Sequence, residues 1–379
     1  MSIPLKELNF EQAVQYHYEQ FPPLVLDYQK IMHQLVKATD ALARFDQMLK
    51  KMHNSEILLA PLRNQEAVIS SRMEGTVSTM DEILKYEADY EQNGDDNTGA
   101  IRSEIIETLL YQRSLKGAQK AVEDGQPISQ FLIKATHQKL LSFGRGASKT
   151  PGQYKNEQNY LVDRTRRNVL FVPTSPERLQ EGMDKLFEYI EKSEDPILIK
   201  TAIAHIEFEA LHPFKDGNGR IGRMLITLML WSSGTISAPH FYISGFFEEN
   251  KDIYIDMMRN VSQTNDWTNW CIFFLEAIEK QATRNLEIAE NISALYDEMK
   301  TIFSDALASK WSVNALDYVF TNPVFRNNKF TKNSGIPGAS AARFTRILLD
   351  KELIKMVEAP SGRRPALYAF EPLLELVRV

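Results

Sequence analysis

Twelve residues at positions 212–223, HPFKDGNGRIGR, bring several chemically capable side chains together. Gly217 and Gly219 are poor helix formers, yet they directly precede an apolar run. This order predicts a tight turn whose backbone N–H groups face one concavity at the start of a helix, where an anion is favoured. Arg220 and Arg223 lie three residues apart, so they share one helix face and can flank the same anion.

Two further residues of the stretch indicate catalysis. Asp216 fits beside a polyanion if a divalent cation bridges the carboxylate to phosphate oxygens. His212, expected at the end of the preceding helix, could accept a proton from an attacking hydroxyl. The stretch therefore predicts a phosphoryl or nucleotidyl transfer site. The alternative is a glycine-rich turn between two core helices with solvated arginines, but the number of chemically consistent residues favours the transfer site.

The stretch resembles the motif of the Fic family, H-x-F-x-D-G-N-G-R-x-x-R, at every specified position. GQYKNEQNYL at 152–161, followed by LFVPTSP at 170–176, is similar to the flap hairpin of the family and the proline-rich run after it. EAVISSRMEGTVSTMDEIL at 66–84 resembles the inhibitory segment S-x-x-x-E-G. The resemblance implies a mainly α fold, with a Fic helical core that carries a β-hairpin flap.

The resemblance also implies a reaction, in which His212 activates a Ser, Thr or Tyr hydroxyl of a target protein. That hydroxyl attacks the α-phosphate of ATP, and Asp216 holds Mg²⁺. Tyr254 is implied in the adenine pocket by NKDIYIDMM, although Ile255 stands where the family often has a second tyrosine. The implied nucleotide-binding residues are Gly217, Asn218, Gly219, Arg220, Ile221, Gly222, Arg223 and Tyr254. Phe214 is expected to anchor the loop in the core.

Glu74 is the expected inhibitory residue. A carboxylate paired with Arg223 would occupy the guanidinium meant for the γ-phosphate and misalign the α-phosphate for attack. The family resemblance implies this autoinhibition, and an ordinary solvent-facing glutamate is the alternative. Glu74 could also position a water molecule to remove AMP, which makes de-AMPylation an alternative activity. The target is expected to add to the exposed strand edge of the flap hairpin, which would otherwise be a plain surface hairpin.

Helical periodicity dominates the chain, with examples at 28–53, 129–141, 179–190 and 197–211. We expect an N-terminal helical region at 1–98 with the inhibitory segment, a Fic core at 99–290, and a small winged-helix domain at 291–379. The last region shows a helix, a turn, a second helix from about Ser340 and a strand pair. From Lys310 onward it has eleven Lys or Arg against six Asp or Glu.

Because this C-terminal region is basic, DNA is an alternative partner, which Arg343, Arg346 and the SGRR turn at 361–364 could contact. A transcriptional regulator that uses the Fic core as a nucleotide sensor is therefore an alternative function. A second is a kinase-like relative that moves the γ-phosphate, which Gly219 disfavours because that subgroup has Lys there. A third is a transferase that uses another nucleotide or diphosphate donor. We also consider a second copy of the chain as a partner, in a homodimer.

Composition excludes other classes of protein. The net charge of −6 argues against a protein that binds nucleic acid over its whole surface. The lone Cys271 excludes an internal disulfide and a multi-thiolate zinc site. No apolar run approaches the roughly 18 residues of a membrane span, and the start lacks an apolar signal region, so a cytoplasmic protein is expected.

Two other motifs resemble known binding sites but are not expected to act as such. HIEFEALH at 205–212 has metal-ligand spacing, but we expect His205 to be packed or to support a neighbouring residue. GRGASKT at 144–150 resembles a phosphate-binding loop but lacks its glycine before Lys149, so we expect a plain loop.

Overall fold

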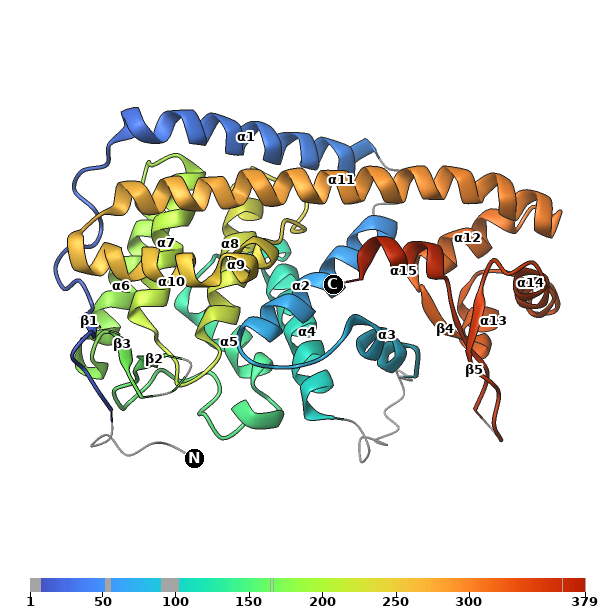
Figure 1. Cartoon of the computed structure of the whole chain (residues 1–379), viewed down its shortest axis with the longest axis horizontal. Coiled ribbons are helices and arrows are strands. Elements are labelled where there is room, and N and C mark those ends of the chain that lie inside the picture. Colours follow the sequence, from blue (N-terminus) through green and yellow to red (C-terminus); the bar gives the residue numbers. More distant parts are fainter. Residues whose placement is uncertain are drawn as a thin grey trace. The chain divides into compact units, whose positions relative to one another are not determined.

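The computed structural model is mainly helical with two small sheets, which confirms the predicted fold class (Figure 1). The structure describes residues 8–51, 56–89, 102–163, 165, 167–362 and 364–378. The chain folds into two compact units, Met1–Asp46 with Met73–Gly75 and Leu110–Thr283, and Gln47–Arg72 with Thr76–Leu109 and Arg284–Val379. The three regions expected from the sequence divide the chain differently and stay a prediction. Among the described residues, no helix has both the length and the apolarity to cross a bilayer.

The first unit is built around two helices that are apolar on nearly every side. These are α7 (Ile197–Leu211) and α8 (Asn218–Ser232), which pack against each other and bury most of their residues. Helices of this kind belong in a core, because no face of them favours water. The surrounding helices are most of α1 (Tyr28–Lys51) and of α4 (Ser103–Glu123), together with α5 (Gln130–Leu140), α6 (Pro176–Lys192), α9 (Ser244–Glu249), α10 (Lys251–Thr264) and the first part of α11 (Trp267–Leu307).

The predicted helix starts and loops agree well with the structure. α5 begins after Ser129, whose side chain accepts a hydrogen bond from Leu132 N. The GRGASKT segment is a loop with one short 3₁₀ turn, Gly144–Gly146. The chemically rich stretch at 212–223 is the α7–α8 connection together with the first turns of α8, as expected.

The predicted hairpin is present but belongs to a three-stranded sheet. β2 (Leu161–Val162) pairs antiparallel with β3 (Val169–Val172), whose other edge pairs in parallel with β1 (Val14–Gln15). The sequence did not predict β1. Because β3 is central, β2 and β1 carry the outer edges of this sheet, so a peptide that adds to the hairpin has only β2 to pair with. Arg164 and Arg166 of the turn lie outside the described residues.

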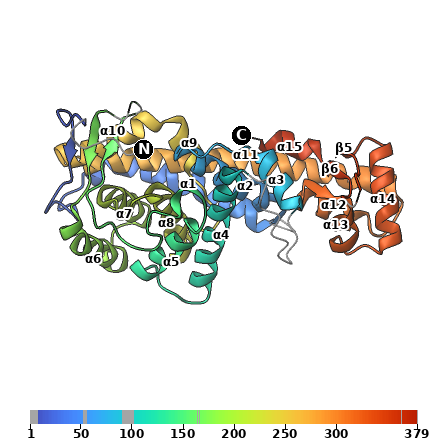
Figure 2. The same cartoon turned by 90° about the horizontal axis from the view of Figure 1, so that it is seen from below.

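The second unit contains the remaining helices and the other sheet (Figure 2). Its helices are α2 (Glu56–Met73), α3 (Met80–Asp89), the end of α11, α12 (Ser312–Thr321), α13 (Asn327–Asn333), α14 (Gly338–Asp350) and α15 (Glu371–Val377). A capping box begins α3, since Thr79 N donates to Glu82 Oε2 at 2.9 Å and Glu82 N donates to Thr79 Oγ1 at 3.2 Å. The polar segment QNGDDNTG at 92–99, whose composition predicts a linker or surface loop, lies outside the described residues.

The end of this unit has the predicted helix–turn–helix and strand pair. A third strand, β4 (Val324–Arg326), joins β5 (Lys355–Glu358) and β6 (Leu367–Ala369) in the order β4-β6-β5. Arg343 and Arg346 are exposed on α14, but Arg364 of the SGRR turn donates to Asp89 Oδ2 at 2.6 Å. Arg363 lies outside the described residues. The winged-helix assignment and DNA binding stay predictions.

Candidate active site

The loop from His212 to Gly217 is held rigidly between α7 and α8. His212 ends α7 in the left-handed region, at φ 46° and ψ 61°, and Gly217 precedes α8 with φ 81°. The Asn218 side chain closes the loop, because its Nδ2 donates to Phe214 O and its Oδ1 accepts from Phe214 N, both at 2.8 Å. Phe214 is fully buried, which agrees with its expected anchoring role. The Asn218 side chain therefore stabilises the loop, and its polar atoms are already used there instead of binding an anion.

His212 has the protonation state that a general base needs. Its Nδ1 lies 3.4 Å from the carbonyl oxygen of Glu209, an acceptor that selects the tautomer with the proton on Nδ1. Nε2 then keeps its lone pair. Burial, assisted by the charge of Lys155, lowers the pKa of His212 to about 4. The imidazole is therefore neutral at pH 7 and can accept a proton.

Arg220 lies in the first turn of α8 with most of its guanidinium unpaired. Its side chain is 4% exposed, and Nη2 lies 3.6 Å from Asp216 Oδ1. Nε and Nη1 are buried and have no hydrogen-bond partner among the described residues. Burying a cation without satisfying its donors is costly. Because the amides of the first helical turn also lack intrahelical acceptors, this position is built to receive an anion.

Asp216 is positioned by a histidine that the sequence did not indicate. His137 Nδ1 accepts from Gly152 N at 2.8 Å, so its Nε2 carries the proton and donates to Asp216 O at 2.9 Å. The His137 ring also stacks on Phe214, with ring centroids 3.7 Å apart. Burial lowers the pKa of His137 to about 4, which keeps this arrangement neutral. No local pattern could have revealed His137, because it acts across 79 residues.

Glu74 reaches the start of α8 and pairs with Arg223. Arg223 Nη2 lies 2.8 Å from Glu74 Oε1, with Arg223 2% and Glu74 30% exposed. Burial would raise the pKa of the Glu74 carboxyl, but Arg223, Arg220 and Lys251 outweigh it and the pKa is lowered. A Cβ on Gly219 would collide with Glu74 Oε1, so the absent side chain at 219 makes room for this carboxylate. The contact predicted for Glu74 is thus present within the first unit.

Glu74, His212 and Arg223 face a cavity of about 340 Å³, at the lower end of the range for small-molecule sites, whereas Asp216 and Arg220 do not form part of its wall. Its wall includes Glu74, Glu209, His212, Gly219, Arg223 and Tyr254, with Leu161 and Val162 of β2. Tyr254 is buried and its hydroxyl lies 2.8 Å from His205 Nε2, so His205 is packed against a neighbour as expected. Ile221 is buried, and its N–H donates to Gly217 O. The binding roles assigned to these residues stay predictions.

Glu209 is a second carboxyl of this cavity, which the sequence indicated only as one member of the metal-ligand spacing in HIEFEALH. It is 8% exposed, its Oε1 has no hydrogen-bond partner among the described residues, and it lies against Gly222. Burial and the charge of Glu74 raise its pKa to about 8, although Arg223 opposes the shift. Glu209 is therefore mostly protonated at neutral pH. Its position one turn before His212 was visible in the sequence, but its neutral state depends on burial.

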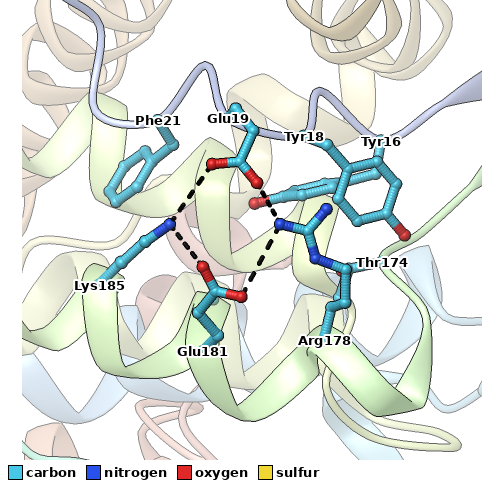
Figure 3. Close-up of a pocket in the computed structure, with 9 residues that line it drawn as sticks. Tyr16, Tyr18, Glu19, Phe21, Thr174, Arg178, Glu181 and Lys185 are labelled. Carbon is cyan, nitrogen blue, oxygen red and sulfur yellow. Dashed lines mark hydrogen bonds and ion pairs between the residues drawn. The ribbon is translucent and has the colours of Figure 1, made fainter.

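A second pocket of the first unit has no room for a comparable ligand (Figure 3). Its volume of about 20 Å³ is enough for a water molecule. Arg178 and Lys185 of α6 alternate there with Glu19 and Glu181, and the side chains point toward one another. Each charge already has an opposite partner, so we interpret this pocket as a surface ion-pair network.

Comparison with known proteins agrees with this geometry. Residues 32–120 match the Fic/DOC family N-terminal region and residues 127–230 match the Fic/DOC family, so the two matches cover about half of the chain. The crystal structure of a Fic family protein from Desulfovibrio desulfuricans G20 aligns over 92% of this chain and 98% of its own, with 17% identity and a TM-score of 0.56. That likeness concerns the fold alone.

Curated relatives match shorter stretches. Protein adenylyltransferase fic-1 from Caenorhabditis elegans is 38% identical over 68 residues, which are 17% of this chain and 13% of that protein. Uridine 5'-monophosphate transferase from Xanthomonas campestris is 38% identical over 72 residues, also 17% and 13%. The chain thus spans only a small part of the curated relatives it matches. By the two family matches and the fold, the chain belongs to the Fic/DOC family.

Proposed function

We propose that the protein is an ATP-dependent adenylyltransferase that transfers AMP to a Ser, Thr or Tyr hydroxyl of a protein. The buried guanidinium of Arg220, with two unpaired donors at the start of α8, carries this proposal. An anion bound to this guanidinium would lie a few residues from the neutral, half-buried His212, and phosphate-centred transfer requires such a pairing of anion site and base. The match to an enzyme named protein adenylyltransferase supports AMP as the transferred group.

In the proposed reaction, the target hydroxyl gives its proton to Nε2 of His212. Its oxygen forms a bond to the α-phosphorus of ATP, the bond to the bridging oxygen breaks, and pyrophosphate leaves with that electron pair. The backbone amides of Asn218 and Gly219 and the Arg220 guanidinium stabilise the charge on the phosphate oxygens. Arg223 binds the distal phosphates once Glu74 has moved away.

Asp216 is the residue that would hold Mg²⁺. Its side chain is 37% exposed, and its Oδ1 accepts from Gly217 N at 2.7 Å and lies 3.6 Å from Arg220 Nη2. Both contacts are made by Oδ1, so Oδ2 is the oxygen that can bind a hard cation. Among the described residues no group of three potential ligands is found. This fits Mg²⁺ as a metal bound through one carboxylate, with phosphates and water as the other ligands. A bound Mg²⁺ would supply positive charge next to the reacting phosphate.

The proposal includes regulation and target docking. Glu74 inhibits, because its carboxylate occupies the guanidinium and the space above Gly219 that the distal phosphates need. The target adds as a strand to the outer edge of β2, since β3 is already paired on both sides. Leu161 and Val162 of β2 line the same cavity as His212, so a hydroxyl on that added strand lies near the base.

The experiment compares intact mass after incubation with Mg²⁺ and ATP. Wild type, Glu74→Gly and Glu74→Gly/His212→Ala are treated together, and a lysate with α-labelled ATP serves as an external source of targets. We expect AMP to be added by the Glu74→Gly chain, less by wild type, and not by the double variant. Absence of AMP on both the chain and the lysate proteins would overturn the proposal.

The donor nucleotide needs its own test, because one relative is named for transferring uridine 5'-monophosphate. Under the proposal, unlabelled ATP suppresses transfer from α-labelled ATP at lower concentration than UTP does. Transfer of label from α-labelled UTP in preference to ATP would replace AMP by UMP and leave the roles of His212 and Arg220 unchanged.

A further inference from the structure

Four consecutive carbonyl groups, from Leu211 to Phe214, all receive hydrogen bonds from one short segment that precedes β2. Lys155 Nζ donates to Leu211 O at 3.1 Å, and the Lys155 backbone N donates to Pro213 O at 2.8 Å. Asn159 Nδ2 donates to His212 O at 3.2 Å and to Phe214 O at 3.1 Å. The two side chains are themselves joined, since Lys155 Nζ donates to Asn159 Oδ1 at 2.8 Å.

This segment acts where the backbone needs support. The last carbonyls of a helix have no intrahelical partner, and His212 adopts a left-handed conformation that costs about 1 kcal/mol or more for a residue with a Cβ. The hydrogen bonds from Lys155 and Asn159 satisfy these carbonyls in this one conformation. They therefore determine where the Cα–Cβ bond of His212 points.

Lys155 is an unusual residue for a hydrogen-bond donor with only a structural role, because it is a buried lysine. It is 3% exposed and forms no ion pair among the described residues, although buried lysines are rarely left unpaired. Burial lowers its pKa to about 7, and its charge in turn contributes to the low pKa of His212. An asparagine or serine could donate to one carbonyl without this desolvation. The lysine thus acts on both the position and the basicity of the histidine.

We propose that Lys155 and Asn159 are positioning residues for the base: they fix the backbone of residues 211–214 and thereby aim the His212 imidazole at the substrate hydroxyl. The inference rests on the proposed function for its catalytic consequence. Its structural part, the ordering of the loop, holds independently of which group is transferred. Neither residue belongs to the 212–223 motif.

The activity test uses the Glu74→Gly chain as the parent. Asn159→Ala and Lys155→Met should lower the rate of AMP transfer at saturating ATP by about ten- to a hundredfold, because small misplacements of a base are costly, with the KM for ATP within twofold. Lys155→Arg, which keeps a charged donor, should recover most of the rate. Asn156→Ala and Lys149→Met are matched controls, since both side chains are exposed on the same stretch.

A second readout does not depend on transfer. Hydrogen exchange of peptides that cover 211–219 should accelerate in Asn159→Ala and Lys155→Met, with the melting temperature within a few degrees of the parent and no change in Asn156→Ala. A normal rate and normal exchange in Asn159→Ala would overturn the inference. If the parent itself transfers no nucleotide, the proposed function fails, whereas the exchange measurement still decides whether the loop is held as inferred.

Discussion

The pairing of Glu74 with Arg223 leads to a quantitative prediction for Glu74→Gln. The change removes the negative charge and keeps the shape of the side chain, so Arg223, which is 2% exposed, loses its carboxylate. A buried hydrogen bond between charged groups contributes about 1.5–3 kcal/mol. We take this range rather than the larger cost of breaking a fully buried pair, because Glu74 is 30% exposed.

ATP must displace a charged carboxylate from Arg223 in the wild type but only a neutral amide in the variant. The same 1.5–3 kcal/mol should therefore reappear as an ATP affinity about ten- to a hundredfold tighter in Glu74→Gln. Without nucleotide, the variant should unfold at a melting temperature lower by roughly 3–10 °C, and saturating ATP should remove most of that difference. Titration calorimetry with Mg²⁺ and ATP, together with thermal unfolding with and without nucleotide, measures both effects.

Glu191→Gln is the matched control, because Glu191 is exposed on α6, and it should change neither quantity. Equal ATP dissociation constants for wild type and Glu74→Gln would refute the reasoning, since the carboxylate and the distal phosphates would then not compete. Tighter binding without any loss of stability would also count against it, because both effects come from the same interaction.

Three further predictions concern neighbouring residues. Gly219→Ala should push Glu74 away and yet weaken ATP binding in calorimetry, because the new Cβ would lie 2.9 Å from Arg223 Nη1 and fill the space that the phosphates need; unchanged stability and affinity would contradict this. The raised pKa of Glu209, about 8 against 4.5, means that the folded state holds its proton longer, so stability falls as pH rises between these values. Glu209→Gln should lose that decline in urea unfolding at pH 5, 7 and 9, and a parallel decline in both proteins would contradict it. Because the pKa of His212 is about 4, transfer by the Glu74→Gly chain should not fall as the pH is lowered from about 6.5 to about 5; a loss of activity with an apparent pKa near 6.5 would contradict this, because a solvated imidazole titrates there.

The residues that the sequence predicted best are those whose chemistry is local. His212, Asp216 and Arg220 share one loop and the first helical turn, so their spacing alone brings them together. The helix starts at Thr79 and Ser129 are local in the same sense, because a capping residue contacts amides only two or three positions away. In such cases the geometry follows from the backbone of one element.

Residues that act over long distances in the sequence could not be predicted from spacing. Glu74 and Arg223 are 149 positions apart, and only the family resemblance connected them. His137, Lys155 and Asn159 lie on other segments and act on backbone carbonyls, which leave no trace in side-chain patterns. The same holds for β1, a two-residue strand that exists because the edge of β3 is available to it.

The charges around the cavity show that inhibition by Glu74 is electrostatic as well as steric. His212 and Glu209 are mostly neutral at pH 7, because burial opposes the charged form of each. Arg223, Lys251 and Arg259 are then the cations in the cavity wall, with Arg220 nearby in the first turn of α8, and the ionised Glu74 offsets the charge of Arg223. Removing the Glu74 carboxylate would therefore strengthen the attraction of the cavity for a polyanion, even for a ligand that the Glu74 side chain does not obstruct sterically. It would also favour ionisation of Glu209, whose raised pKa partly reflects the Glu74 charge, so Glu209 becomes a second group able to pair with Arg223 when no nucleotide is bound.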